Sequence, residues 1–301
     1  MEWWQLGECK IMHIPVLERE LLDCLNLKEN HNFVDCTLGE GGHAEAILNK
    51  SKTSLVLGIE WDKDLFRKTQ KRMASYKKRL MLANDNYRNL KEVVRGFGSG
   101  IKFDGIYFDL GTCLWHYQES TRGFSFKKNE VFDMRFSENI KIKGVDILNN
   151  WSCKEIEKIF QDYGEIKEAG NLARYIEIKR KKTPIKTSQD FVDLVYSSPI
   201  SGKRKKDVLR KAFQAIRIEI NQELENLKEG LSQAVDVVGT HGVIAVITYH
   251  SLEDRIVKNF FNNSVKLRAI NSKPIRPGLL EKRFNSSSRS AKLRFAYKIV
   301  D

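Results

Sequence analysis

The chain has 301 residues, of which 41% are apolar, so it can bury a sizeable core. No run of residues has the length and apolar character of a transmembrane helix, so we expect no membrane-spanning protein. The 52 Lys and Arg against 39 Asp and Glu give a net charge of +13, which favours an anionic partner, nucleic acid rather than lipid. A basic surface without any such partner is the alternative.

Cysteine and histidine usage argues against metal and disulfide chemistry. The five cysteines form no C-x-x-C pair, and the six histidines do not stand at ligand spacing, so we expect reduced thiols and no bound metal. Met1–Lys10 lacks the apolar run of a signal peptide. These features together predict a cytoplasmic protein.

The stretch Asn32–His43 (N-F-V-D-C-T-L-G-E-G-G-H) begins with strand-forming residues and ends in a glycine-rich turn. Ala44–Leu48 then has the composition of a helix. Strand, glycine turn and helix are the opening of a nucleotide-binding α/β unit, in which backbone without Cβ lets a ligand approach closely. The dinucleotide fingerprint is incomplete, so a purely structural turn stays open and a nicotinamide dehydrogenase is disfavoured.

The next apolar segment, Ser54–Glu60, predicts a second strand that ends in an acid. Glu60 stands 21 positions after Gly39. A carboxylate about 20 residues downstream of such a turn is where ribose hydroxyls are bound. The pair favours a ribose-bearing cofactor.

Further strands are predicted at Leu80–Ala83, Phe103–Asp109 and Gly242–Tyr249, with helical segments between them. This alternation predicts a parallel, doubly wound sheet whose ligands lie beyond the carboxyl ends of its strands. Glycine or polar groups follow four of these strands, at Gly39–His43, Glu60, Asp85–Tyr87 and Asp109.

From about residue 131 to 211 the pattern is helical without strands, which predicts an inserted helical domain. Lys211–Val238 follows helical spacing throughout and predicts one long amphipathic helix. The next helix is expected to begin with Ser251 as N-cap and Asp254 reaching back. Val265–Ala269 and Ala291–Ile299 predict an edge hairpin with a long basic connection.

Several long motifs occur in one order along the chain: D-L-G from Asp109, R-G-F-S-F from Arg122, D-M-R from Asp133, F-Q-A-I-R-I from Phe213 and H-S-L-E-D-R-I-V-K from His250. With these motifs the chain resembles the bacterial ribosomal small-subunit RNA cytidine-N4 methyltransferases of the MraW/RsmH family, as a divergent member. The resemblance implies an α/β class I S-adenosylmethionine-dependent methyltransferase with a Rossmann-like sheet. It implies a methyltransferase domain at 1–130 and 212–301 and an inserted helical substrate-recognition domain at 131–211.

The resemblance also implies roles for single residues. The cofactor S-adenosyl-L-methionine would be lined by Gly41, Gly42 and His43, with Glu60 on the ribose and Tyr87 beside the adenine. Asp109 would lie next to the methyl donor and is the expected catalytic acceptor for the cytidine amine. His116 falls where the family commonly has a cofactor-contacting glutamine.

The implied substrate is a cytidine in the decoding region of 16S rRNA, free or in the small ribosomal subunit. Two basic stretches could neutralise phosphates: 265–298, with ten Lys or Arg against one acid, and 178–211, with eleven against three. Aromatic residues within Phe124–Phe136 could stack on bases or form core. Either Asp109 acts in catalysis or it only caps the following loop.

The sequence departs from the family's pattern at Glu40, at Thr112–His116 and at Asn129–Phe132. These departures leave two alternatives open. One is an RNA-binding ribosome-assembly factor on a degenerate methyltransferase fold, and the other is an amino methyltransferase with another nucleic-acid target.

Overall fold

The computed structural model describes residues 14–98 and 100–300, so Met1–Lys10 and Cys9 lie outside the described residues. The chain divides into two compact units, residues 1–111 with 230–301 and residues 112–229. The second unit extends beyond the predicted insertion, 131–211, at both ends. Phe124 belongs to its core, and one helix runs without interruption through residue 211.

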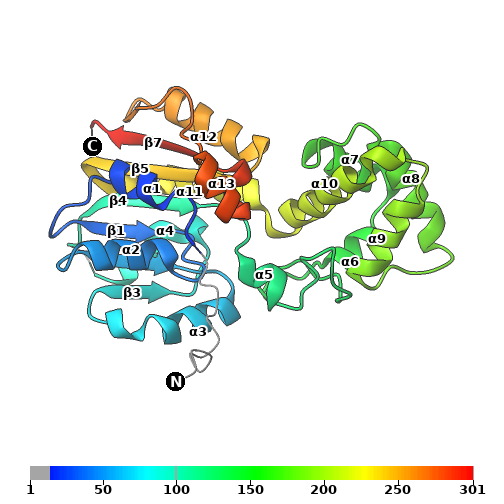
Figure 1. Ribbon diagram of the computed structural model, residues 1–301, viewed down its shortest axis with the longest axis horizontal. Coiled ribbons are helices and arrows are strands. Elements are labelled where there is room, and N and C mark those ends of the chain that lie inside the picture. Colours follow the sequence, from blue (N-terminus) through cyan, green and yellow to red (C-terminus); the bar gives the residue numbers. More distant parts are fainter. Residues whose placement is uncertain (1–13, 99, 301) are drawn as a thin grey trace, which may run out of the picture. The chain divides into compact units, whose positions relative to one another are not determined.

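A seven-stranded sheet forms the first unit, in the order β3-β2-β1-β4-β5-β7-β6 (Figure 1). Strands β1 to β5 are parallel, whereas β7 is antiparallel to both β5 and β6. The predicted parallel sheet and edge hairpin are therefore confirmed. The strands are β1 (Asn32–Asp35), β2 (Leu55–Ile59), β3 (Leu80–Ala83), β4 (Phe103–Asp109), β5 (Val238–Thr248), β6 (Leu267–Ala269) and β7 (Lys292–Lys298).

Helices connect the parallel strands, as the alternating pattern predicts. Chain order along the sheet reverses between β1 and β4, and at such a switch point α/β proteins bind ligands beyond the carboxyl ends of the strands. The helices of this unit are α1 (Glu18–Cys24), α2 (Gly42–Lys50), α3 (Lys63–Arg72), α4 (Leu90–Gly96), α12 (Ser251–Asn263) and α13 (Leu279–Phe284), with short 3₁₀ turns η1 (Ala74–Tyr76), η2 (Tyr87–Asn89) and η3 (Ser286–Ser290).

The core of the first unit forms where apolar strand residues meet the apolar sides of α1 and α2. Phe33 of β1 and Tyr107 of β4 are fully buried there with Leu21, Ile47 and Leu48. Burial of such large side chains is the main stabilising contribution to the sheet, at roughly 1.5–3 kcal/mol for each aliphatic or phenylalanine side chain. The sheet is thereby a rigid support for the loops at its edge.

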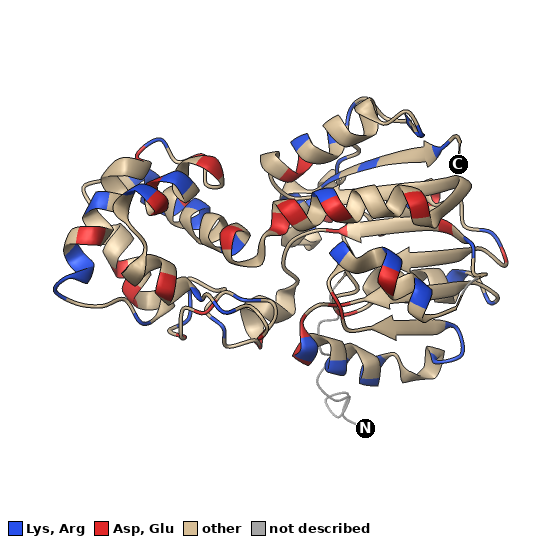
Figure 2. Cartoon of the chain, turned by 180° about the vertical axis from the view of Figure 1, so that it is seen from behind, with Lys and Arg blue, Asp and Glu red and all other residues tan. Residues whose placement is uncertain are grey.

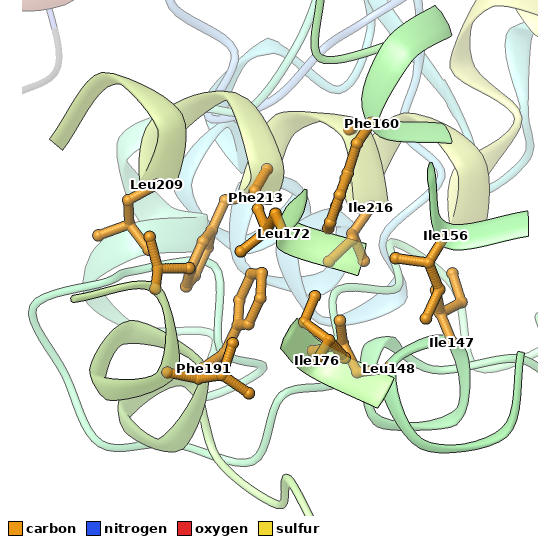
Figure 3. Close-up of a cluster of buried hydrophobic side chains, with 14 of the residues drawn as sticks. Ile147, Leu148, Ile156, Phe160, Leu172, Ile176, Phe191, Leu209, Phe213 and Ile216 are labelled. Atoms are coloured by element: carbon orange, nitrogen blue, oxygen red, sulfur yellow. The ribbon is translucent and has the colours of Figure 1, made fainter. Parts of the chain in front are cut away.

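The second unit is helical. Its core is an aromatic and aliphatic cluster, part of which is shown in Figure 3. The ring centroids of Phe132, Phe191 and Phe213 in this cluster lie 5.0–5.5 Å apart. Its helices are α5 (Leu114–Gln118), α6 (Gly144–Asn150), α7 (Cys153–Asp162), α8 (Ala169–Arg180), α9 (Ser188–Ser197), α10 (Gly202–Asn221) and α11 (Glu223–Val237), the last of which continues into the first unit.

The prediction that aromatic residues within Phe124–Phe136 stack on bases is wrong for Phe124 and Phe132. Phe124 is 3% exposed and Phe132 is fully buried, and Phe126 packs against Phe213. Side chains whose faces are covered by the core have no surface left for a base. The core alternative therefore holds for Phe124 and Phe132.

The predicted helix Lys211–Val238 is two helices. Gln222 separates α10 from α11 in the left-handed region, with φ of 50°. Hydrophobic periodicity did not indicate this break, because the apolar spacing continues across it. Arg217 spans the break with a bidentate ion pair to Glu223, at 2.8 and 3.0 Å.

The start of α12 also differs from the prediction. His250, not Ser251, is the N-cap, and the returning carboxylate belongs to Glu253 rather than Asp254. Glu253 is 2% exposed and accepts hydrogen bonds from the backbone N–H groups of Tyr249, at 2.8 Å, and His250, at 3.2 Å. Asp254 pairs instead with Arg294 of β7, at 2.7 Å. The motif thus fixes the turn after β5.

Candidate functional site

The glycine turn after β1 lies at the switch-point edge of the sheet. Gly39 and Gly41 have φ of 55° and 82°, a region that L side chains adopt only at a cost. A Cβ at Gly41 would lie 2.2 Å from the sulfur of Met73, and the hydroxyl of Thr69 donates to the carbonyl of Gly39 at 2.7 Å. The turn therefore requires glycine and is attached to α3.

Glu40 does not leave an uncompensated negative charge in this turn. Its carboxylate pairs with the ammonium group of Lys68 at 3.2 Å, and Arg72 donates to its carbonyl oxygen at 2.8 Å. Both partners belong to α3. This departure from the family's pattern is thus accommodated by pairing toward a neighbouring helix.

Glu60 follows β2 and contacts the same turn. Its two carboxylate oxygens accept hydrogen bonds from the backbone N–H groups of Gly39, at 2.9 Å, and Asp62, at 2.7 Å. Burial raises the pKa of Glu60 to about 8, partly offset by these two donors. In the ionised form each oxygen keeps a second lone pair, so the side chain can still accept from hydroxyl groups.

Asp109 ends β4 and is held from two sides. The hydroxyl of Tyr249 donates to Oδ1 at 2.6 Å, and Nδ1 of His43 lies 3.7 Å from Oδ2. The backbone N–H of Asp109 donates to the hydroxyl of Thr37 at 2.6 Å, which joins the ends of β1 and β4. The carboxylate has a fixed orientation at the switch point.

His43 is the second residue of α2 and is 7% exposed. Its Nε2 lies 2.9 Å from the carbonyl oxygen of Val16, which can only accept, so Nε2 carries the proton. Burial lowers the pKa of His43, and the neutral ring then presents the lone pair of Nδ1 toward Asp109. A neutral imidazole here is a hydrogen-bond acceptor.

Asp35 and Tyr249 belong to this cluster although sequence reasoning did not select them. Asp35, at the end of β1, is 1% exposed, and burial raises its pKa to about 7. It accepts from the hydroxyl of Tyr107 at 3.0 Å and from the backbone N–H of Thr37 at 3.1 Å. The available signal was an acid within the apolar run of β1.

Tyr87 lies in the turn after β3 and is half-buried. Its ring packs edge-on against Phe108 with centroids 5.5 Å apart, and a Cβ at Gly230 would lie 2.7 Å from it. One side of the ring is therefore used in packing against β4 and α11. Any contact with a ligand would use the remaining surface.

His116 is in the second unit, whereas the other predicted cofactor residues are in the first. It is 5% exposed, and its ring lies 5.1 Å from both Phe124 and Phe136. The sulfur of Cys113 lies 3.3 Å from its Nδ1. In this unit His116 is a packed residue, and its contact with the cofactor stays a prediction.

The residues at the switch point suit a cationic nucleoside cofactor. Glu60 offers acceptors for hydroxyl groups, and the carboxylate of Asp109 gives the edge acidic character suited to a positive charge. Within residues 14–98 and 100–300 no cluster of side chains could hold a metal ion. In the same part of the chain no helix combines the length and apolar character needed to cross a bilayer.

Sheet order, glycine turn and strand-end acids together define a Rossmann-like α/β protein with a helical second unit. The chain belongs to the MraW methylase family, whose profile matches residues 10–299. The predicted family and class I methyltransferase sheet are thereby confirmed, and S-adenosylmethionine is the methyl donor of such a protein.

Curated relatives match nearly the whole chain. The ribosomal RNA small subunit methyltransferase H of Persephonella marina is 38% identical over 295 residues, covering 96% of this chain and 100% of its own. The protein of the same name from Carboxydothermus hydrogenoformans is 37% identical, covering 95% and 98%. A solved rRNA methylase from Streptococcus thermophilus is 12% identical and gives a TM-score of 0.44 over 94% of both chains.

Proposed function

We propose that this protein transfers a methyl group from S-adenosylmethionine to N4 of a cytidine in the decoding region of 16S rRNA. The observation that carries the proposal is the Asp109 carboxylate, fixed by Tyr249 at the switch point of a methylase-family sheet. The relatives' shared name, ribosomal RNA small subunit methyltransferase H, supports the substrate.

The first unit would hold the cofactor. Gly41, Gly42 and His43 would line it, Glu60 would accept from the ribose hydroxyls, and Tyr87 would contact the adenine. When bound, S-adenosylmethionine supplies a methyl group on a positively charged sulfur. Glu60 is suited to its part, because the backbone donors of Gly39 and Asp62 orient both of its oxygens as acceptors.

Asp109 would act on the nucleophile. The exocyclic amine of cytosine is a poor nucleophile because its lone pair is delocalised into the ring. A carboxylate that accepts a hydrogen bond from this amine orients the lone pair and takes up the proton as the nitrogen becomes tetrahedral. The hydroxyl of Tyr249 donates to Oδ1 and so fixes the orientation of the carboxylate that would face the amine.

The second unit would bind the RNA. Exposed lysines occur on it at the end of α8 and the start of α10, and Figure 2 marks Lys and Arg along the chain. Such clusters neutralise phosphates and give salt-dependent affinity. The predicted insertion, 131–211, would be the main part of this substrate-recognition domain.

His116 would complete the cofactor contacts. A protein acting on small ribosomal subunits would be cytoplasmic.

The test uses purified protein, labelled S-adenosylmethionine and small subunits from cells that lack the gene, with the modified position mapped by nuclease digestion and mass spectrometry. We expect one N4-methylated cytidine in 16S rRNA. Asp109→Asn keeps the shape of the side chain but removes its charge, and we expect a loss of about 10²–10⁴-fold in the rate of transfer.

Other outcomes favour the alternatives. Cofactor binding without transfer to any RNA would support the ribosome-assembly factor. The departure from the family's pattern at Thr112–His116 is the observation that suggests this alternative. Transfer to an amine at another position would support a different target. Absence of cofactor binding would contradict both methyltransferase readings.

A further inference from the structure

Helix α13 carries an unusual concentration of exposed apolar side chains. Leu279 is 86% exposed, Leu280 72% and Phe284 74%. Among the described large apolar residues, only Val265 is exposed to a similar extent. Three such side chains within six residues are more than the scattered apolar groups of an ordinary surface, and a patch of this kind marks an interaction site.

The exposure belongs to a well-attached helix. Glu281 accepts a hydrogen bond from the backbone N–H of Leu17 at 2.8 Å, and Asn285 donates to the carbonyl oxygen of Ile14 at 2.9 Å. An isolated bridge between Ile275 and Leu293 joins the preceding segment to β7. One side of α13 is thereby attached to the first unit, and its apolar residues stand on the other.

The surroundings of these residues are basic. Between residues 265 and 298 there are ten Lys or Arg and one acid, Glu281, which is engaged by Leu17. Of the ten, Lys292 and Arg294 pair with Asp254 and Lys298 is buried, so the exposed basic groups are those before residue 290. The guanidinium group of Arg283 lies 5.8 Å from the centroid of the Phe284 ring, and Arg276 and Arg289 are exposed. The patch thus combines an exposed aromatic ring with exposed positive charge.

We propose that α13 is a contact surface for single-stranded RNA, with Phe284 stacking on an unpaired base and Arg283 pairing with a phosphate. The inference rests on the proposed function and adds a substrate surface on the first unit. An aromatic ring beside basic groups is the pattern of sequence-tolerant single-strand binding. The phenylalanines of the second unit's core cannot serve, because packing covers their faces.

RNA fits this surface better than a lipid bilayer does. A helix that lies in a membrane interface buries a long apolar face, whereas α13 has six residues and rises only about 9 Å. A flat base needs no more than one ring and a neighbouring cation. The chemistry of α13 therefore matches a nucleobase with its phosphate.

The experiment measures binding of the full chain to a fluorescein-labelled 20-nucleotide single-stranded RNA by anisotropy at several salt concentrations. We expect Phe284→Ala to weaken binding about 5- to 100-fold at every salt concentration, because stacking is not screened. Phe284→Trp should retain the affinity. Arg283→Gln should make the slope of log affinity against log salt shallower by about 0.7.

Val265→Ala is the matched control, since Val265 is 86% exposed and lies just before β6. Strand β6 pairs with β7 at Lys298, the opposite end of β7 from Lys292. It should leave RNA affinity unchanged. Unchanged affinity of Phe284→Ala would overturn the proposal. So would an effect confined to phosphatidylserine vesicles, or to self-association measured by light scattering. Binding of S-adenosylmethionine, measured by calorimetry, separates the two proposals. If the unmodified chain does not bind the cofactor, the proposed methyltransferase activity is contradicted, but the proposed RNA surface is not.

Discussion

At the scale of single residues, the hydrogen bond from the Tyr249 hydroxyl fixes the orientation of the Asp109 carboxylate. Burial, and next the charge of Asp109, raise the pKa of Tyr249 well above its usual range, so its hydroxyl stays protonated and acts as a donor. A hydrogen bond to a charged acceptor contributes about 1.5–3 kcal/mol. Tyr249 is thus a positioning residue in the proposed reaction.

The variant Tyr249→Phe should lower the rate of methyl transfer about 10- to 100-fold, with little change in cofactor affinity. The carboxylate would also hold its proton to higher pH, because a donor to its charged form is lost. The acidic limb of the pH–rate profile should therefore move to higher pH. Tyr297→Phe serves as the control. A lower rate with an unmoved profile would indicate a structural role alone.

Asp35 should make the stability of the fold depend on pH. Its pKa in the folded state, about 7, is higher than in an unfolded chain, chiefly because of burial. The folded state therefore binds a proton that the unfolded state has lost, and the contribution of Asp35 to stability falls as the pH rises from about 4 to 7.

Asp35→Asn removes this titration. We expect the free energy of unfolding of the variant, relative to the unmodified chain, to rise between about pH 4 and pH 7 and to level off above that. Urea unfolding followed by circular dichroism at each pH measures the difference. A pH-independent difference would show that Asp35 does not titrate in this range in the folded state.

At the scale of elements, the junction of α10 and α11 contains an ion pair between Arg217 and Glu223. The side chains of Arg217 and Glu223 are 11% and 10% exposed, and Arg217 also lies 3.3 Å from the hydroxyl of Thr112. Removing one member of a buried pair leaves a charge without compensation. The junction is where the left-handed Gln222 turns the chain.

Arg217→Met should destabilise the protein by about 3–5 kcal/mol, and the double variant Arg217→Met with Glu223→Met should recover much of that loss. Urea unfolding gives both values. Arg210→Met is the matched control, because the Arg210–Asp207 pair of the same helix is more than half exposed and should contribute less than about 1 kcal/mol. A double variant as unstable as the single one would refute the electrostatic explanation.

Sequence patterns predicted the elements better than their ends. The five parallel strands were recognisable because short apolar runs alternate with helical segments, which is the pattern of a parallel α/β sheet. The break at Gln222 was not, since apolar spacing continues through it. The N-cap of α12 was misplaced by one residue because both Glu253 and Asp254 could reach back, and only tertiary pairing with Arg294 distinguishes them.

The site was predictable to a similar degree. Glu60 and Asp109 were visible as strand-end acids, and each is near the switch point of the sheet. Tyr249 and Asp35 were not, because their roles depend on side chains from other strands, Asp109 and Tyr107. Contacts between residues so far apart in sequence leave no local pattern.

At the scale of the whole molecule, each unit has its own core, and positive charge occurs on both. A net charge of +13 attracts any polyanion, so total charge alone cannot explain selective binding of RNA. Whether the position of the positive charges determines RNA binding can be tested on four exposed lysines of the second unit, Lys181, Lys182, Lys203 and Lys206.

Replacing these four lysines by glutamine should weaken binding to single-stranded RNA and make its salt slope shallower by about 3, because each phosphate contact contributes about 0.7. The control replaces four exposed lysines of the first unit, Lys52, Lys71, Lys77 and Lys78, and so changes net charge equally. Anisotropy titrations from low to physiological salt give both slopes. Equal slopes would mean that net charge alone drives binding, whereas a shallower slope in the first variant only would assign phosphate contacts to the second unit.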